Sequence, residues 1–145
     1  MEIKRALIVE DNKTFRSIMR VALAALGVKD VEEAEEGRAA LEIIRDGGAD
    51  LVLMDWMMEG IDGLDCARRI RGGAVENGDA IPIVMISGSA DGDLQTQALL
   101  SGVDVCLSKP ISLARLTAGV ARAVDMRRAA IGDESGFMLP TPTGV

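Results

Sequence analysis

ALIVED, residues 6–11, is a short apolar run that ends in two carboxylates. Three later stretches have the same form, an apolar run followed by polar side chains: LVLMD (51–55), IVMIS (83–87) and VCLSK (105–109). Runs of this length that alternate with stretches of helical periodicity are typical of parallel strands in βαβ units. Because parallel strands end at one edge of a sheet, we expect an acidic pair, a lone carboxylate, a hydroxyl and an amine in one crevice.

The stretches between these runs carry apolar residues at every third or fourth position, which predicts helices. We expect helices at 15–26, 36–46, 64–71, 91–101 and 113–128, one further strand at 28–34, and a last strand that spans 103–108. Ser112 is expected to cap the last helix, and Leu113, Leu116, Val120 and Val124 are predicted to share one face of that helix. Residues 74–82 read as a polar surface loop. The predicted fold class is α/β, with a five-stranded parallel sheet flanked by five helices.

The length and composition predict one domain. The chain has 145 residues, of which 48% are apolar, and this suits a single domain with a sizeable core. After residue 130 the sequence loses its periodicity and gathers Gly, Pro and Thr. We therefore expect a domain at 1–130 and a flexible C-terminal tail at 131–145.

Charge and residue usage exclude several classes of function. The net charge of −7 argues against binding to nucleic acid or to anionic membranes. No signal peptide and no membrane-length apolar run is evident, so a cytoplasmic location is expected. The chain contains no histidine, which excludes Ser-His-Asp triads, His-ligated zinc and a phosphohistidine carrier. Its two cysteines, Cys66 and Cys106, are expected to be buried free thiols.

The acidic residues at the strand ends predict a metal site. Glu10, Asp11 and Asp55 are expected to converge, and such a cluster stays ionised only with a cation among it. Hard oxygen ligands in small number suit Mg²⁺ that completes its shell with water and a phosphate oxygen. Asp55 is then the candidate nucleophile for a phosphoryl group, and Ser87 and Lys109 are candidates to bind that group.

Four motifs at these positions resemble the receiver domain of two-component response regulators. They are VEDN at 9–12, DWMMEGIDG at 55–63, SGSA at 87–90 and LSKP at 107–110. The resemblance covers residues 4 to about 125 and is closest in kind to chemotaxis-type single-domain receivers. It implies a flavodoxin-like sheet with the strand order 2-1-3-4-5.

The resemblance also implies a role for each site residue. Asp55 is implied as the phosphoacceptor, and Mg²⁺ is implied to bind Glu10, Asp11, Asp55 and the backbone carbonyl of Met57. Ser87 and Lys109 take the hydroxyl and lysine positions that bind the phosphoryl group. Lys109-Pro110 is implied to be a cis peptide bond.

The chain departs from the family pattern at positions that bear on switching. The position three before the lysine usually holds an aromatic switch residue, and here it holds Cys106. Ile111 stands where a Phe often follows, and Glu59 stands where a Pro is typical. Met57 and Ser89 occupy the positions that tune access of water to the acyl phosphate, which predicts an altered phosphoryl lifetime.

The function predicted from the sequence is that of a stand-alone receiver, a signalling phosphoacceptor rather than an enzyme. A sensor histidine kinase or a histidine phosphotransfer protein is the expected donor. The expected output is binding of another protein through the region of the fourth strand, fourth helix and fifth strand, or phosphorelay by a monomer or weak dimer. The alternatives are a receiver-like protein-binding module that is not phosphorylated, and a phosphatase with an Asp nucleophile. A phosphatase of that kind would want a second Asp at position 57, where Met57 stands.

Overall fold

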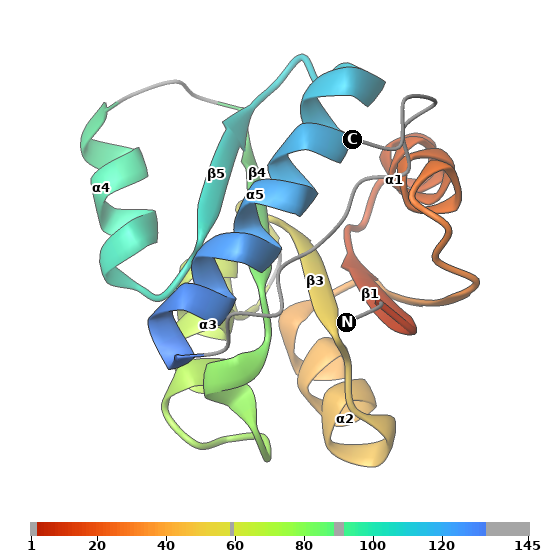
Figure 1. Cartoon of the computed structure of the whole chain (residues 1–145). Helices are drawn as coiled ribbons and strands as arrows, with labels where there is room; N and C mark the ends of the chain where they lie inside the picture. The colour runs from red at the N-terminus through yellow and green to blue at the C-terminus, as the bar shows by residue number, and fades with distance from the viewer. Residues whose placement is uncertain (1–2, 59, 89–91, 133–145) are drawn as a thin grey trace.

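The computed structural model describes residues 3–58, 60–88 and 92–132. Strands and helices alternate along the chain, and a 3₁₀ helix (η1) precedes the fourth strand (Figure 1). In chain order the elements are β1 (Arg5–Val9), α1 (Lys13–Ala25), β2 (Asp30–Ala34), α2 (Gly37–Gly47), β3 (Leu51–Asp55), α3 (Gly63–Arg71), η1 (Gly78–Ala80), β4 (Ile83–Ser87), α4 (Gly92–Leu100), β5 (Val105–Ser108) and α5 (Leu113–Ile131).

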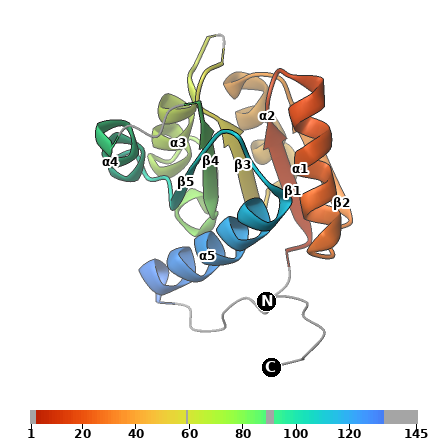
Figure 2. The ribbon, with the colours of Figure 1, turned by 90° about the horizontal axis from the view of Figure 1, so that it is seen from above.

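The five strands form one parallel sheet in the order β2-β1-β3-β4-β5, which confirms the predicted fold class and strand order. Alternate residues of each strand face opposite sides of the sheet, and each side carries its own apolar core. Residues of α1 and α5 complete one core, and residues of α2, α3 and α4 complete the other. Figure 2 shows α5 and α3 on opposite sides of the sheet.

Side-chain caps and a glycine mark the helix ends. Asn12 accepts a hydrogen bond from the backbone N–H of Phe15, and Ser112 accepts one from that of Arg115, as predicted for the last helix. Gly27 follows α1 with a φ of 83°, a left-handed conformation that suits glycine. The predicted helix start at Asp91 lies outside the described residues.

Two predictions are wrong, and one predicted helix face is only partly buried. Of the residues predicted to share a face of α5, Leu116, Val120 and Val124 are buried, whereas Leu113 in the first turn is 44% exposed. Residues 74–82 are not simply a polar loop, since they include η1 and bury the side chains of Val75 and Ile81. The second and last strands each begin two residues later than predicted, at Asp30 and Val105.

The amino end of the sheet holds a buried ion-pair cluster, which we call the Asp104 clamp: Asp104, Arg71 and Arg127. The two Asp104 carboxylate oxygens lie 3.0 Å from Nη2 of Arg71 and 2.8 Å from Nη2 of Arg127. The backbone N–H of Ile83 also donates to Asp104, at 2.8 Å. Burial and the neighbouring Arg127 lower the pKa of Arg71 to about 10. The clamp therefore joins α3, β4, β5 and α5 through one carboxylate.

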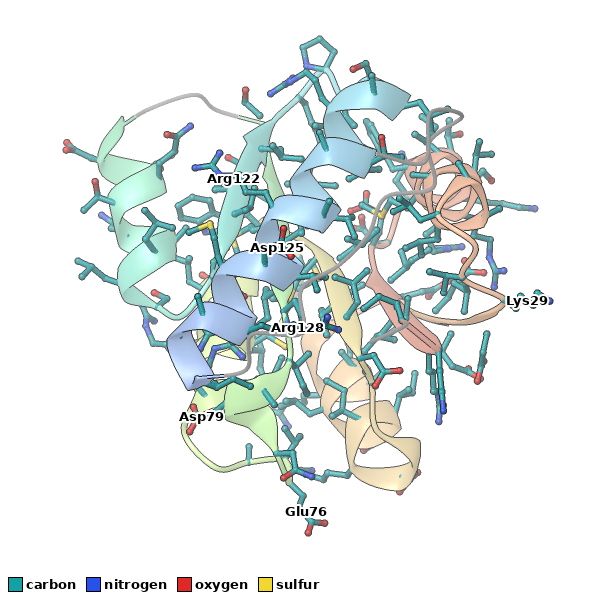
Figure 3. The ribbon with its side chains drawn as sticks, in the orientation of Figure 1. Lys29, Glu76, Asp79, Arg122, Asp125 and Arg128 are labelled. Atoms are coloured by element: carbon teal, nitrogen blue, oxygen red, sulfur yellow. The ribbon has the colours of Figure 1, made fainter. Side chains whose placement is uncertain are left out.

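The arginines near the end of α5 are more enclosed than the sequence suggests. Arg128 is 4% exposed, and Figure 3 shows its side chain directed toward the body of the molecule, whereas Lys29 and Glu76 project outward. Helix α5 continues to Ile131, and Gly132 caps it with a left-handed φ of 82°. The predicted tail lies outside the described residues from position 133 onward. Among the described residues, no helix is both long and apolar enough to cross a membrane.

Candidate functional site at the carboxyl end of the sheet

Three carboxylates meet where β1 and β3 end. Glu10 and Asp11 follow β1 directly, and Asp55 is the last residue of β3. One carboxylate oxygen from each residue lies within 4.8 Å of the others. Glu10 and Asp55 are 1% and 5% exposed, whereas Asp11 is open to solvent. The arrangement is that of a shallow acidic site with one accessible side.

Lys109 supplies the positive charge of this site. Its Nζ lies 3.5 Å from Oδ1 of Asp55 and 4.2 Å from the centre of the Phe15 ring. The backbone N–H of Lys109 donates to the carbonyl of Ser87 at 2.7 Å, which holds the end of β5 beside the end of β4. The Lys109-Pro110 peptide bond is cis, as the resemblance implies.

Ser87, the candidate hydroxyl of the site, also lies at this edge of the sheet. Ser87 is the last residue of β4, and its side chain is buried. Asp55 on β3 pairs with Ile86 on β4. Ser87 is the next residue after Ile86, so it lies close to Asp55 along the sheet edge. Ser89 lies outside the described residues.

The electrostatics of the site favour a bound cation. Oε2 of Glu10 is buried and has no hydrogen-bond partner among the described residues. Burial, together with a hydrogen bond to Asp55 and its charge, raises the pKa of Glu10 to about 7. A cation that binds oxygen ligands would interact with Oε2 of Glu10 and would offset the repulsion between the carboxylates. The residues present therefore fit Mg²⁺.

Met57 is exposed at the surface, and Cys106 is partly buried. The Met57 side chain is 75% exposed, so it lies at the surface of the molecule and not in a core. Cys106 is half-buried on β5 and packs against the core on the side of α2, α3 and α4. Burial raises the pKa of the Cys106 thiol and raises that of fully buried Cys66 to about 12. The prediction of a buried free thiol is confirmed for Cys66, while Cys106 is only half-buried.

Two residues of α1 belong to the site although the sequence did not single them out. Arg16 donates from Nη1 to the backbone carbonyl of Glu10 at 2.8 Å, and its Nε lies 2.7 Å from a carboxylate oxygen of Glu33. Phe15 enters the sequence analysis only as the first residue of the helix predicted at 15–26, yet its ring lies against the Lys109 ammonium. The available signal was their place in the first turns of α1, directly after the acidic pair.

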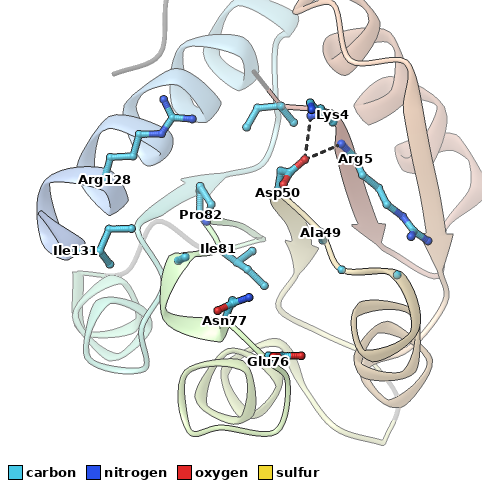
Figure 4. A pocket seen from close by; sticks show the side chains of 14 residues that line it. Lys4, Arg5, Ala49, Asp50, Glu76, Asn77, Ile81, Pro82, Arg128 and Ile131 are labelled. Atoms are coloured by element: carbon cyan, nitrogen blue, oxygen red, sulfur yellow. Dashed lines mark hydrogen bonds between the residues drawn. The ribbon is translucent and has the colours of Figure 1, made fainter. Parts of the chain in front are cut away.

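A larger hollow among the described residues lies away from the acidic site. A cavity of about 500 Å³ lies at the amino end of the sheet, where Figure 4 shows Asp50 accepting hydrogen bonds from the backbone of Lys4 and Arg5. A smaller hollow of about 410 Å³ adjoins the acidic site, with Asp11 on its rim. The chemistry of the acidic cluster, rather than cavity size, identifies the candidate site.

Comparison with known proteins supports this identification. Residues 6–121 match the response regulator receiver domain family. The chain is 35% identical to chemotaxis protein CheY-3 of Vibrio cholerae over 112 residues, which cover 77% of this chain and 85% of that protein.

Two solved receiver domains have the same fold. The signal receiver domain of NarL from Mycobacterium tuberculosis superposes with a TM-score of 0.76 at 28% identity, over 86% of this chain and 98% of that one. The receiver domain of sensor histidine kinase PA1611 from Pseudomonas aeruginosa superposes with a TM-score of 0.73 at 28% identity, over 85% and 98%. That structure holds a magnesium ion coordinated in its active-site cleft. By its sequence, its fold and its acidic site, the chain belongs to the response regulator receiver domain family.

Proposed function

We propose that this protein is a receiver that accepts a phosphoryl group on Asp55 in a Mg²⁺-dependent reaction. The observation that carries the proposal is the meeting of three carboxylates within 4.8 Å with an ammonium 3.5 Å from one of them. Such a set offers a cation site, a nucleophile and a positive partner for a phosphoryl group in one place. The donor would be a sensor histidine kinase or a histidine phosphotransfer protein.

The transfer step requires little of the protein beyond placement. A carboxylate oxygen of Asp55 forms a bond to phosphorus while the bond from phosphorus to the donor atom breaks, and the electron pair of that bond leaves with the donor. Glu10, Asp11, Asp55 and the Met57 carbonyl would hold Mg²⁺, which supplies charge neutralisation at the phosphoryl oxygens. Lys109 and Ser87 lie at the adjacent strand ends and would bind the transferred group.

Signalling would follow from the added charge. Phosphorylation of Asp55 replaces one negative charge with nearly two and adds strong hydrogen-bond acceptors. Charge-assisted hydrogen bonds contribute about 1.5 to 3 kcal/mol each, so Ser87 and Lys109 together can shift a loop between two states. Cys106 cannot supply the rotation of an aromatic ring, and the switch in this chain must use another group.

The surface formed by β4, α4 and β5 is the proposed site of the downstream partner. Helix α4 buries Ala98 but leaves Leu99 53% exposed and Leu100 83% exposed. Apolar side chains on such a surface suit a protein partner better than a nucleic acid. The cytoplasmic location, the monomeric or weakly dimeric state, and the division into a domain at 1–130 and a flexible tail at 131–145 stay predictions.

The test uses Trp56, the only tryptophan, which is buried directly after Asp55. Its fluorescence is titrated first with Mg²⁺ and then with acetyl phosphate, and intact mass measures the phosphoryl adduct. We expect a saturable response to Mg²⁺, followed by a second change and an adduct that Asp55→Ala abolishes. An unmodified mass in the wild-type protein, under conditions that phosphorylate a known receiver, would contradict the proposal.

The second candidate is a protein-binding module that is not phosphorylated, and Cys106 at the switch position favours it. It predicts no Mg²⁺ response and no adduct. The phosphatase alternative predicts steady release of phosphate from a phosphomonoester, and Met57 at the position of the second Asp disfavours it.

A further inference from the structure

The Lys109 ammonium has two partners among the described residues, and one of them is not charged. Its Nζ lies 3.5 Å from Oδ1 of Asp55 and 4.2 Å from the centre of the Phe15 ring. An ammonium over the face of an aromatic ring within about 6 Å is attracted by the ring quadrupole. The ring and the carboxylate thus hold the same ammonium.

The backbone places both side chains firmly. Phe15 lies in the first turn of α1, where its N–H donates to the cap residue Asn12 at 3.1 Å. Lys109 is tied to β4 by the bond from its N–H to the carbonyl of Ser87. The backbone of both residues is therefore fixed, but the four-carbon side chain of Lys109 is flexible. A contact with its ammonium group restricts the rotamers that this side chain can adopt.

We propose that Phe15 is a positioning residue for phosphoryl transfer, acting through Lys109. The inference rests on the proposed function, in which Lys109 binds the phosphoryl group on Asp55. The aromatic ring attracts the ammonium without competing with Asp55 for a proton or for Mg²⁺. A second carboxylate in its place would draw Lys109 away from the phosphoryl oxygens, and an aliphatic side chain would give packing without electrostatic attraction.

An ordinary packing role for Phe15 makes a different prediction. Packing depends on the size and shape of the ring, whereas attraction of the ammonium depends on the electron density of its face. Successive fluorination of the ring weakens that electron density while it changes the shape little. The rate of phosphorylation should therefore fall with each added fluorine only if the ring acts on Lys109 electrostatically.

The composition of the chain permits this experiment. The protein has two phenylalanines, Phe15 and Phe137, and no tyrosine. In a Phe137→Leu background, fluorinated phenylalanine supplied during expression therefore changes only the ring of Phe15. The Phe137→Leu protein is first compared with the wild type to establish that the background substitution leaves the rate unchanged.

The measurement is the rate at which the acyl phosphate forms on the full chain from acetyl phosphate at saturating Mg²⁺, followed by intact mass. From unmodified to trifluorinated Phe15 we expect a stepwise loss of about two- to fivefold in total, the size of an exposed cation–π contact. The melting temperature should stay constant across the series. Phe15→Leu should lose at least as much rate as the most fluorinated ring.

The control that isolates the contact is a double-mutant cycle with Lys109→Ala. Without the ammonium, fluorination should have no effect on the remaining rate. Equal rates across the series on a protein that is phosphorylated, or the same slope with and without Lys109, would overturn the positioning role alone. No adduct on the wild-type protein would overturn the proposed function and the positioning role with it.

Discussion

The two ends of the β-sheet hold charge in opposite ways. At the amino end, the buried carboxylate of Asp104 is matched by two guanidinium groups and a backbone N–H. At the carboxyl end, three carboxylates share the single ammonium of Lys109, and Oε2 of Glu10 has no hydrogen-bond partner among the described residues. Both clusters lie on the same sheet and include buried carboxylates, yet only at the amino end does the buried carboxylate have a full set of positive partners from the protein itself.

The difference separates structure from function. A buried charge with its partners in place belongs to the packing of the fold, and removing one partner exposes the cost of burying the others. A buried charge that lacks a partner destabilises the fold and is expected where a ligand supplies what is missing. On this reasoning the amino end stabilises the molecule, and the carboxyl end is where, under the proposed function, a cation and a phosphoryl group would bind.

The largest effect is expected from breaking the Asp104 clamp. Asp104→Ala leaves the partly buried guanidinium groups of Arg71 and Arg127 without their carboxylate, which should reduce the free energy of unfolding by about 3 kcal/mol. Urea denaturation at pH 7 measures this loss of stability. Asp50→Ala is the control, because the exposed carboxylate of Asp50 accepts two backbone hydrogen bonds at this end of the sheet but forms no ion pair with the residues that the structure describes. A loss no greater than that of the control would contradict the clamp.

The opposite sign is expected at the carboxyl end. The pKa of Glu10 is raised from 4.5 to about 7, so the folded protein binds more protons than the unfolded chain between these values. Stability without Mg²⁺ should therefore fall as the pH rises from 4.5 to 7, and Glu10→Gln should remove that fall. At pH 8 we expect Glu10→Gln to be more stable than the wild type by about 1–3 kcal/mol.

The comparison of urea curves at pH 5 and pH 8, with EDTA present, checks this sign. At pH 5 the carboxyl of Glu10 is largely protonated, and the two proteins should differ little. If Glu10→Gln is less stable than the wild type at pH 8, the charge of Glu10 stabilises the fold, as the charge of Asp104 is expected to do, and the prediction is wrong.

Binding of Mg²⁺ should depend on pH for the same reason. The ion competes with the proton on Glu10, so its apparent affinity should rise about tenfold between pH 6 and pH 8 and level off above 7. Titration of Trp56 fluorescence at several pH values measures this affinity. In Glu10→Gln the affinity should be weaker, and the rise should disappear. An equally steep rise in that variant would assign the proton to another group.

The smallest effect is expected from Met57, whose side chain is 75% exposed. Met57→Asn should leave the free energy of unfolding within about 0.5 kcal/mol of the wild type. An amide at this position can orient a water molecule that the thioether cannot, so we expect the acyl phosphate to decay about two- to tenfold faster, a barrier change of ~0.4–1.4 kcal/mol. Loss of the adduct followed by intact mass gives the half-life, and an unchanged half-life would remove Met57 from the control of phosphoryl lifetime.

The contrast between the two ends also explains what the sequence predicts well. The apolar runs before Glu10, Asp55, Ser87 and Lys109 predict where each strand ends, and strand ends determine which side chains share the crevice. Such information is local to each strand. It is therefore available without knowledge of how the helices pack.

The residues that were missed depend on contacts between elements. The sequence placed Asp104 inside a strand and Arg127 at a helix end, and nothing in either pattern indicates that their side chains meet. Val75 and Ile81 are buried because η1 packs under α3 and α5, a contact that periodicity does not report. The position of Phe15 against Lys109 likewise joins the first helix to the last strand.

The site draws on four strand ends that are spread over a hundred residues of chain, from Glu10 to Lys109. During synthesis, the acidic cluster is complete once β3 has emerged, but the ammonium is among the last residues of the sheet to be made. A truncated or partly folded chain would thus carry the carboxylates without the lysine that pairs with Asp55. Such a chain would lack the complete site.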